Sequence, residues 1–212
     1  MKVTKYEHAC FTVEIDGKTL IVDPGSYTKS LEIPNNVVAI VITHGHGDHF
    51  DPDVLAAVFD KNPQSVLVSL PEIVDMMPDH PSKKVASGDK VTIEPFELEF
   101  FGGKHAEIND KYMQTGDNLG VFINDIIYYP GDSFAQPNRP VSLLALPTSG
   151  PWLKVGEIID FLRAVKPTKF FLVHDFHNSE AGQDLVKQLT HPHAEAINSE
   201  LIALVVGESL EV

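Results

Sequence analysis

The sequence of 212 residues holds a single cysteine, Cys10. One cysteine cannot form an internal disulfide, which agrees with a reducing compartment, and its apolar neighbours predict a buried small hydrophobic residue. No run of about 18 apolar residues occurs, which excludes a membrane-spanning helix. The first eight residues also lack the apolar core of a signal peptide. We therefore expect a cytoplasmic protein that does not interact with membranes.

Positive charge is scarce as well. Lys and Arg number 16 against 30 Asp and Glu, which gives a formal net charge of −14. Nucleic-acid binding draws most of its affinity from basic side chains that neutralise phosphates, and the longest basic runs here are pairs such as Lys83-Lys84. A nucleic-acid partner is therefore not expected. The sequence leaves open whether copies of the chain form a homo-oligomer.

Internal repeats, low-complexity tracts and Gly/Ser linkers are missing from the sequence. Hydrophobic residues make up 43% and charged residues 22% of the chain, a composition typical of a globular protein. The length and this even composition predict one domain spanning residues 1–212. No Gly-x-Ser-x-Gly motif occurs, so a covalent serine mechanism has little support.

Turn signals and apolar runs predict strands first, and then strands that alternate with helices. Asp16-Gly17 and Asn124-Asp125 are two-residue turns between apolar runs. The unbroken β-branched run 37–42 is typical of a strand buried on both faces. Strands are expected at 10–15, 19–22, 37–42, 66–69, as a pair within 90–103, and at 119–123, 126–129, 143–146, 170–173 and 201–206. Helices are expected to begin at 52 and to cover 71–77, 155–165 and 180–189. This order favours helices layered outside paired sheets.

A cluster of histidines follows the buried strand 37–42. It reads His44-Gly45-His46-Gly47-Asp48-His49, which places three imidazoles and a carboxylate within six residues. Glycines without a Cβ would let the backbone turn tightly, so that neighbouring imidazoles converge. Open sheets also place their ligands at the carboxyl ends of strands. A hydrophilic turn that happens to contain histidines is the plain alternative, and a metal site is the stronger interpretation.

Together with four further segments, this cluster resembles the metallo-β-lactamase superfamily. The matching segments occur in order along the chain and carry Asp23 at 22–24, the cluster at 44–49, His105 at 103–105, Asp132 at 129–133 and His174 at 171–175. The resemblance implies a four-layer αββα sandwich with a two-metal site between the sheets. Three segments are similar to the small ascorbate-6-phosphate-lactonase-like branch, namely 8–11, 23–24 and 147–152.

The resemblance also implies a role for each of these residues. The ligands of the first metal ion would be His44, His46 and His105, and those of the second Asp48, His49 and His174. Asp132 would bridge the two ions, and Asp23 would orient a ligand histidine. Asp48 and His174 are the expected catalytic residues, with Asp48 holding or deprotonating the nucleophile.

The implied cofactor is a pair of divalent metal ions. Imidazole and carboxylate suit Zn²⁺, and a catalytic zinc keeps one position open for water. Mixed nitrogen and oxygen ligands also suit Mn²⁺ or Fe²⁺, so zinc is the first choice on family grounds only. Taken one at a time, Asp23 and Asp132 could be turn residues and His174 a histidine of the core. The shared motif favours an orienting role for Asp23 and metal binding for His174, and for Asp132 the apolar run 126–129 before it favours metal binding as well.

The remaining polar candidates are less defined. His177 could face the site and bind a substrate oxyanion or phosphate, or it could simply be solvated. His8 begins a hairpin and could lie near the site. Thr148 and Ser149 are candidates for substrate contact. The histidines expected at the surface are His80, His191 and His193.

The expected function is therefore that of a metal-dependent hydrolase. A hydroxide shared by two metal ions would attack an ester, lactone or phosphoester bond in a small anionic substrate. Phosphodiesterase or nuclease action is an alternative, although the charge of −14 counts against it. A di-iron redox role normally needs a fused flavin domain, for which the chain is too short. A non-catalytic metal-binding protein is a further alternative, which a complete set of ligands disfavours.

Overall fold

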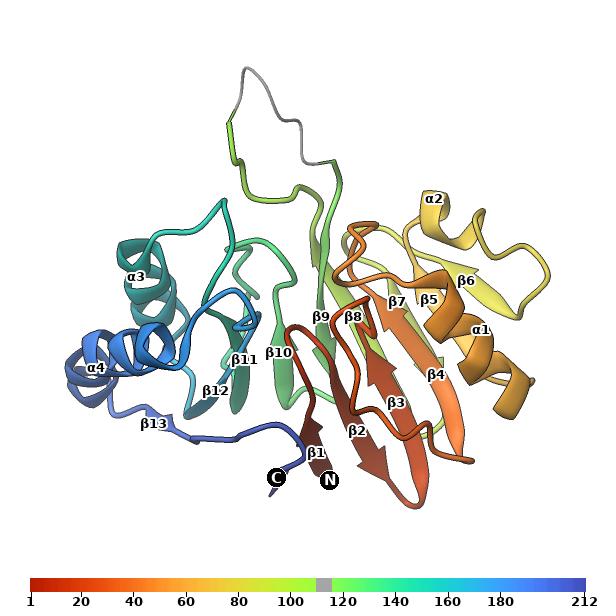
Figure 1. Ribbon diagram of the computed structural model, residues 1–212, viewed down its shortest axis with the longest axis horizontal. Coiled ribbons are helices and arrows are strands. Elements are labelled where there is room, and N and C mark those ends of the chain that lie inside the picture. The colour runs from red at the N-terminus through yellow and green to blue at the C-terminus, as the bar shows by residue number, and fades with distance from the viewer. Residues whose placement is uncertain (110–115) are drawn as a thin grey trace.

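The computed structural model describes residues 1–109 and 116–212, and its strands form two sheets of seven strands each (Figure 1). The first sheet has the order β14 (Ser209–Glu211), β1 (Lys2–Lys5), β2 (Phe11–Ile15), β3 (Lys18–Val22), β4 (Val37–Ile42), β5 (Val66–Ser69) and β6 (Ser82–Lys84). The second has the order β13 (Glu200–Leu201), β12 (Lys169–Val173), β11 (Leu143–Pro147), β10 (Ile127–Tyr129), β9 (Leu119–Ile123), β8 (Phe96–Gly102) and β7 (Lys90–Ile93).

The two sheets share one pairing scheme. In the first, β14, β1, β2 and β3 are antiparallel neighbours, whereas β3, β4, β5 and β6 run parallel. In the second, β7 to β10 are antiparallel and β10 to β13 parallel. Each sheet is therefore mixed, and the carboxyl ends of its parallel strands meet at one edge.

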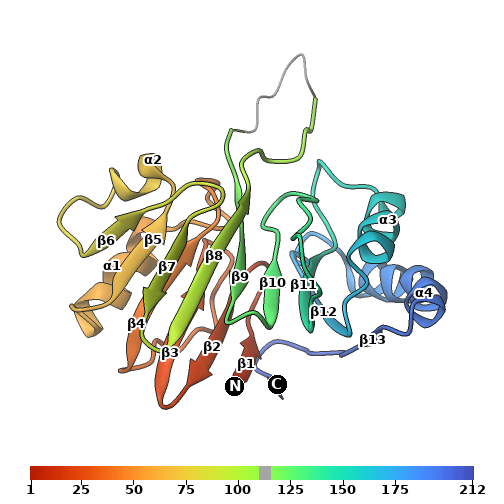
Figure 2. The ribbon, with the colours of Figure 1, turned by 180° about the vertical axis from the view of Figure 1, so that it is seen from behind.

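Helices cover the outer face of each sheet. These are α1 (Pro52–Lys61) and α2 (Pro71–Val74) beside the first sheet, and α3 (Val155–Val165) and α4 (Glu180–Ala196) beside the second (Figure 2). The inner faces pack against each other. The ring of Phe11 on β2 lies 5.5 Å from that of Tyr129 on β10 and 5.8 Å from that of Phe171 on β12. The αββα sandwich expected from the sequence is confirmed.

Local chemistry explains several element boundaries. The Asp51 carboxylate accepts the backbone N–H groups of Asp53 and Val54, at 3.0 and 3.4 Å, and so caps α1. Asp16 and Gly17 both have positive φ, at 50° and 71°, as a two-residue turn between β2 and β3 requires. Both features were readable from the sequence because they depend on adjacent residues.

Three expectations about the elements were wrong. Of the run 201–206 only Leu201 is strand, as the second residue of β13, because after Ile202 the chain leaves the sheet edge and crosses to the first sheet. Helix α4 does not end near residue 189 but continues through Pro192, stabilised by the fully buried Thr190 and by Ala194, which is 3% exposed. Helix α2 stops at Val74, three residues early.

The structure also contains three strands that the sequence analysis did not predict, namely β1, β6 and β14. Each has only three or four residues, most of them polar, which is too short a pattern to predict a strand from the sequence. His80, expected at the surface, packs its ring on Phe59 with centroids 4.0 Å apart. Within the two described ranges, no helix is long and apolar enough to cross a membrane.

Candidate metal centre

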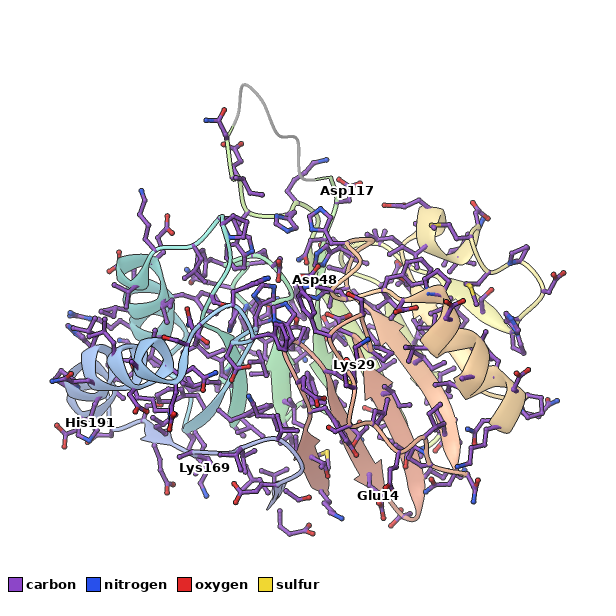
Figure 3. The ribbon with its side chains drawn as sticks, viewed as in Figure 1. Glu14, Lys29, Asp48, Asp117, Lys169 and His191 are labelled. Carbon is purple, nitrogen blue, oxygen red and sulfur yellow. The ribbon has the colours of Figure 1, made fainter. Side chains whose placement is uncertain are left out.

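Five loops bring histidines and aspartates together at the edge where the parallel strands end. Asp23 follows β3, the cluster 44–49 follows β4, and His105 follows β8. Asp132 follows β10, and His174 follows β12. Asp48 lies in the centre of this edge, between the two halves of the molecule (Figure 3). The side chains form two groups, and within each group the ligand atoms lie within 4.8 Å of one another.

The first group consists of His44, His46, His105 and Asp132. His44 Nε2 and His46 Nδ1 are 3.1 Å apart, and His105 Nε2 is 3.3 Å from Asp132 Oδ2. His46 is more exposed than the other three, which are buried. Three imidazoles and a carboxylate at this spacing match the ligand set that a tetrahedral divalent ion requires.

The second group consists of His8, Asp48, His49 and His174. Asp48 Oδ2 lies 3.6 Å from His174 Nε2 and 3.9 Å from His49 Nε2. His8 completes the group through a contact of 3.0 Å between its Nε2 and the same oxygen of Asp48. The sequence analysis had left the role of His8 open.

Asp132 lies between the two groups. Its Oδ2 is 3.3 Å from His105 Nε2 and 3.1 Å from His174 Nε2, and its Oδ1 is 3.2 Å from His49 Nε2. The indole N–H of Trp152 donates to Oδ2 over 2.8 Å and holds the carboxylate from outside. A single carboxylate thus faces imidazoles of both groups.

Hydrogen bonds on the far side of each ring determine which nitrogen faces inward. His105 Nδ1 lies 2.6 Å from the carbonyl of Ala106, and His174 Nδ1 lies 2.6 Å from that of Ser149. A carbonyl can only accept, so Nδ1 carries the proton in both rings and Nε2 keeps a free lone pair. Both Nε2 atoms point toward Asp132.

Asp23 orients the imidazole rings of His49 and His44, the first directly and the second through Thr43. Its Oδ2 lies 2.7 Å from His49 Nδ1 and accepts the Thr43 hydroxyl over 2.6 Å. That hydroxyl has already given its proton to Asp23, so it can only accept from His44 Nδ1, which is 3.1 Å away. Asp23 is fully buried, and its position agrees with the orienting role that the resemblance implied.

Several buried atoms of the centre have no hydrogen-bond partner within the described ranges. They are His8 Nδ1, His49 Nε2, His105 Nε2, Asp132 Oδ1 and His174 Nε2. Buried polar atoms are nearly always paired, since an unpaired one costs about 1–3 kcal/mol. Apart from His8 Nδ1, these atoms belong to groups converging on Asp132. Lone pairs converging in this way fit a pair of metal ions.

Charge and burial together shift the pKa values of the centre. Burial lowers the pKa of His44 well below its ordinary range, and it lowers that of His46 as well. Burial works to raise the pKa of Asp132, but the charges of His49 and His174 outweigh it and hold it well below the usual range. Neutral imidazoles and an ionised carboxylate are the forms that bind metal.

His49 is shifted in the opposite direction. Burial works to lower the pKa of its imidazole, but the carboxylates of Asp132 and Asp23 outweigh burial and raise it well above the ordinary value. This ring lies between two buried carboxylates, so either a proton or a metal ion must balance their charge.

A cavity of about 390 Å³ opens above the centre. Its lining includes Asp48, Asp132 and His174 of the centre, together with Tyr27 and Trp152. Ile108, Pro151 and His177 also line it, and among its described lining residues there is no lysine or arginine. The cavity therefore combines the polar side chains of the centre with the apolar and aromatic surface of a few other residues.

The other candidate substrate contacts lie differently. His177 is exposed and lines the cavity, with its ring 6.0 Å from that of His174. The hydroxyl of Thr148 donates to Val173 O over 3.0 Å, and that of Ser149 donates to His174 O. Neither residue lines this cavity. Their role in substrate binding stays a prediction, whereas their contacts here hold β12 and His174.

The sequence analysis expected the glycines of the cluster to permit a tight turn of the backbone, and this was wrong. Neither Gly45 nor Gly47 has a left-handed φ, and a Cβ at Gly47 would meet nothing within 4 Å. The glycine that the centre needs is Gly25, whose Cβ would lie 2.0 Å from the carbonyl carbon and oxygen of Asp48. The local motif carries no sign of this contact, because Gly25 belongs to another loop.

Sequence reasoning also missed supporting residues of the centre. Asn118 accepts the backbone N–H of Asp132 over 2.9 Å and donates to Pro130 O over 2.9 Å, which fixes the loop that carries Asp132. Trp152 lies in the segment 147–152, noted only as a branch feature. An asparagine one residue before a strand gives no signal in the sequence, so only the fold reveals it.

The fold and the two histidine–aspartate groups define a protein of the metallo-β-lactamase fold. The profile of the beta-lactamase superfamily domain matches residues 2–174, so the chain belongs to this family. Protein Rv0786c of Mycobacterium tuberculosis is 30% identical over 179 residues, which cover 82% of this chain and 84% of that protein.

Two more distant comparisons extend over nearly the whole chain. The UPF0173 metal-dependent hydrolase MJ1163 of Methanocaldococcus jannaschii is 24% identical, with 99% of this chain and 100% of that protein covered. Among solved structures, the metallo hydrolase Igni18 from Ignicoccus hospitalis superposes with a TM-score of 0.75 at 19% identity. The superposition covers 99% of this chain and 97% of that one, which shows that the fold is shared.

Proposed function

We propose that this protein is a hydrolase that depends on two divalent metal ions, with zinc the first choice and Mn²⁺ or Fe²⁺ as alternatives. The main support is a set of buried polar atoms around Asp132 that have no hydrogen-bond partner in the described ranges. His44, His46 and His105 would hold one ion, and Asp48, His49 and His174 the other. Asp132 would bridge them. Bound ions would supply an activated water and a Lewis acid for the carbonyl or phosphoryl oxygen.

The protein's own groups would orient the reaction. Asp48 lines the cavity with a side chain that is 22% exposed, and it would hold the attacking water or deprotonate it. Its pKa favours holding the water, because a lowered pKa keeps the carboxylate ionised as a hydrogen-bond acceptor and makes it a weaker base. Burial works to raise this pKa, but the hydrogen bond from His8 and the charges of His49 and His174 outweigh burial and keep it below the ordinary value.

The cavity suits a small substrate with an ester, lactone or phosphoester bond. An anionic group would be bound by the metal ions and His177, since the described lining holds no lysine or arginine. Tyr27 and Trp152 offer aromatic surface to an apolar part of the substrate. A nucleic acid fits this lining poorly, because its phosphates require several basic contacts.

Metal analysis combined with an activity screen tests the proposal. Protein purified without chelator should contain about two metal ions per chain, because seven candidate ligands exceed what one tetrahedral ion can use. A panel of lactones, thioesters and phosphoesters should reveal an activity that chelator abolishes and Zn²⁺ or Mn²⁺ restores. Reproducible absence of metal, or full activity in metal-free protein, would overturn the proposal.

A substitution of His177 tests the substrate side of the cavity separately. For His177→Ala we expect KM to rise about tenfold, the value of one hydrogen bond to a charged group, while metal content stays the same. His191→Ala is a matched control, because His191 is exposed on α4 outside the cavity. If His177→Ala strips a metal ion, the ligand assignment is wrong.

A further inference from the structure

His8 occupies an unusual place in the turn between β1 and β2. It is a histidine with a left-handed backbone, at φ 59°, and only 1% of its surface is exposed. Left-handed conformations are unfavourable for residues with a Cβ, and such residues concentrate at functional sites. A buried polar side chain on a left-handed backbone, next to the candidate metal centre, suggests that His8 has a specific role there.

Two of the three proposed ligands of the second ion depend on His8. Its Nε2 is 3.0 Å from Asp48 Oδ2, and its backbone carbonyl accepts the N–H of His174 over 2.7 Å. The two imidazole rings are 3.9 Å apart. Because His174 also has a left-handed φ, at 55°, its backbone benefits from an external anchor.

The protonation of His8 is opposite to that of His105 and His174, two of the proposed ligand rings. A deprotonated Nε2 at 3.0 Å would direct a lone pair at the Asp48 carboxylate, so Nε2 must carry the proton and donate it. This leaves Nδ1 without a proton and, in the described ranges, without a partner. In His105 and His174, by contrast, Nδ1 is bonded and Nε2 is free.

Asp48 needs such a donor. It lies on a loop, and in the described part of the chain His8 is the only residue that donates a hydrogen bond to its carboxylate. His49 Nε2 and His174 Nε2 are 3.9 and 3.6 Å from the same oxygen, too far for hydrogen bonds. Without His8, the carboxylate would be free to turn away from the second group toward the open cavity.

We propose that His8 is a positioning residue for the second metal ion, and not a ligand. It holds the Asp48 carboxylate through Nε2–H and the His174 backbone through its carbonyl. This inference rests on the proposed two-metal centre and adds a residue to it. Outer residues that orient metal ligands typically change metal affinity by about 10–100-fold when they are replaced.

Two substitutions separate positioning from ligation. In His8→Gln the side-chain amide can donate from about the position of Nε2, whereas in His8→Asn it reaches only as far as Nδ1. Asparagine also tolerates a left-handed backbone, so the contact to His174 is preserved. Zn²⁺ is titrated calorimetrically into the metal-free full chain, and a thermal melt checks the fold.

For His8→Asn we expect the first ion to bind as in the unmodified protein and the second about 10–100-fold more weakly. His8→Gln should retain both affinities within about threefold, because the hydrogen bond is kept. His191→Asn is the matched control. His191 is exposed on α4 outside the cavity, and both ions should bind unchanged.

Unchanged binding in His8→Asn would overturn the inference. So would equal loss in His8→Gln and His8→Asn, since the imidazole itself would then be required as a ligand. If the unmodified protein binds no Zn²⁺, the proposed function fails instead.

A measurement on the unmodified protein stays decisive even if a variant does not fold. Nitrogen-15 NMR of labelled histidine distinguishes the two tautomers, and His8 should carry its proton on Nε2. A proton on Nδ1 would refute the inference.

Discussion

Replacement of Asp132 by alanine is expected to reduce metal content from about two ions per chain to less than one, with hydrolysis falling at least about 1,000-fold. The carboxylate faces both groups, at 3.1 Å from His174 Nε2 and 3.2 Å from His49 Nε2. Without it no group would join the two ions, and several kcal/mol of charge stabilisation in the transition state would be lost. Elemental analysis and the rate on the best substrate of the panel measure both effects.

The Asp132 variant also leaves a buried donor unpaired. Trp152 Nε1 donates to Asp132 Oδ2 over 2.8 Å, and the loss of that acceptor costs about 1–3 kcal/mol. Asp125→Ala is the matched control, because Asp125 lies on the exposed hairpin before β10 and should keep both metal ions. Two ions retained by Asp132→Ala would show that Asp132 does not bridge.

The second large effect is expected at Gly25. In Gly25→Ala the new Cβ would lie 2.0 Å from the carbonyl carbon and oxygen of Asp48 and 2.4 Å from His49 N. These are backbone atoms, so the loop that carries both side chains must move. We expect loss of the second metal ion and about 1–3 kcal/mol of stability, the usual cost of overpacking. Metal content and thermal unfolding measure the two changes.

Gly47→Ala is the control for this prediction. Gly47 belongs to the histidine cluster itself, yet a Cβ there would meet nothing within 4 Å, and its φ is not left-handed. We expect both metal ions and the melting temperature to be retained. The reverse result, with Gly25→Ala tolerated and Gly47→Ala deficient in metal, would contradict our account of how the loop is held.

The sequence by itself determined those features that depend on neighbouring residues. The turn at Asp16-Gly17 and the helix cap at Asp51 follow from local backbone chemistry, and the structure contains both. The spacing of the cluster after β4 and the four further segments indicated the family, because each lies directly after a strand. The assignment of individual metal ligands stays a prediction that the geometry supports.

Only the tertiary structure decided the contacts that join distant segments. His8 meets Asp48 across 40 positions of the sequence, and Trp152 meets Asp132 across 20. Gly25 is needed because of a loop more than twenty residues away. The run 201–206 is apolar enough for a strand, yet only its first residue, Leu201, belongs to one. Residue patterns record local preference, whereas which loops touch depends on how two sheets pack, and no single segment encodes that.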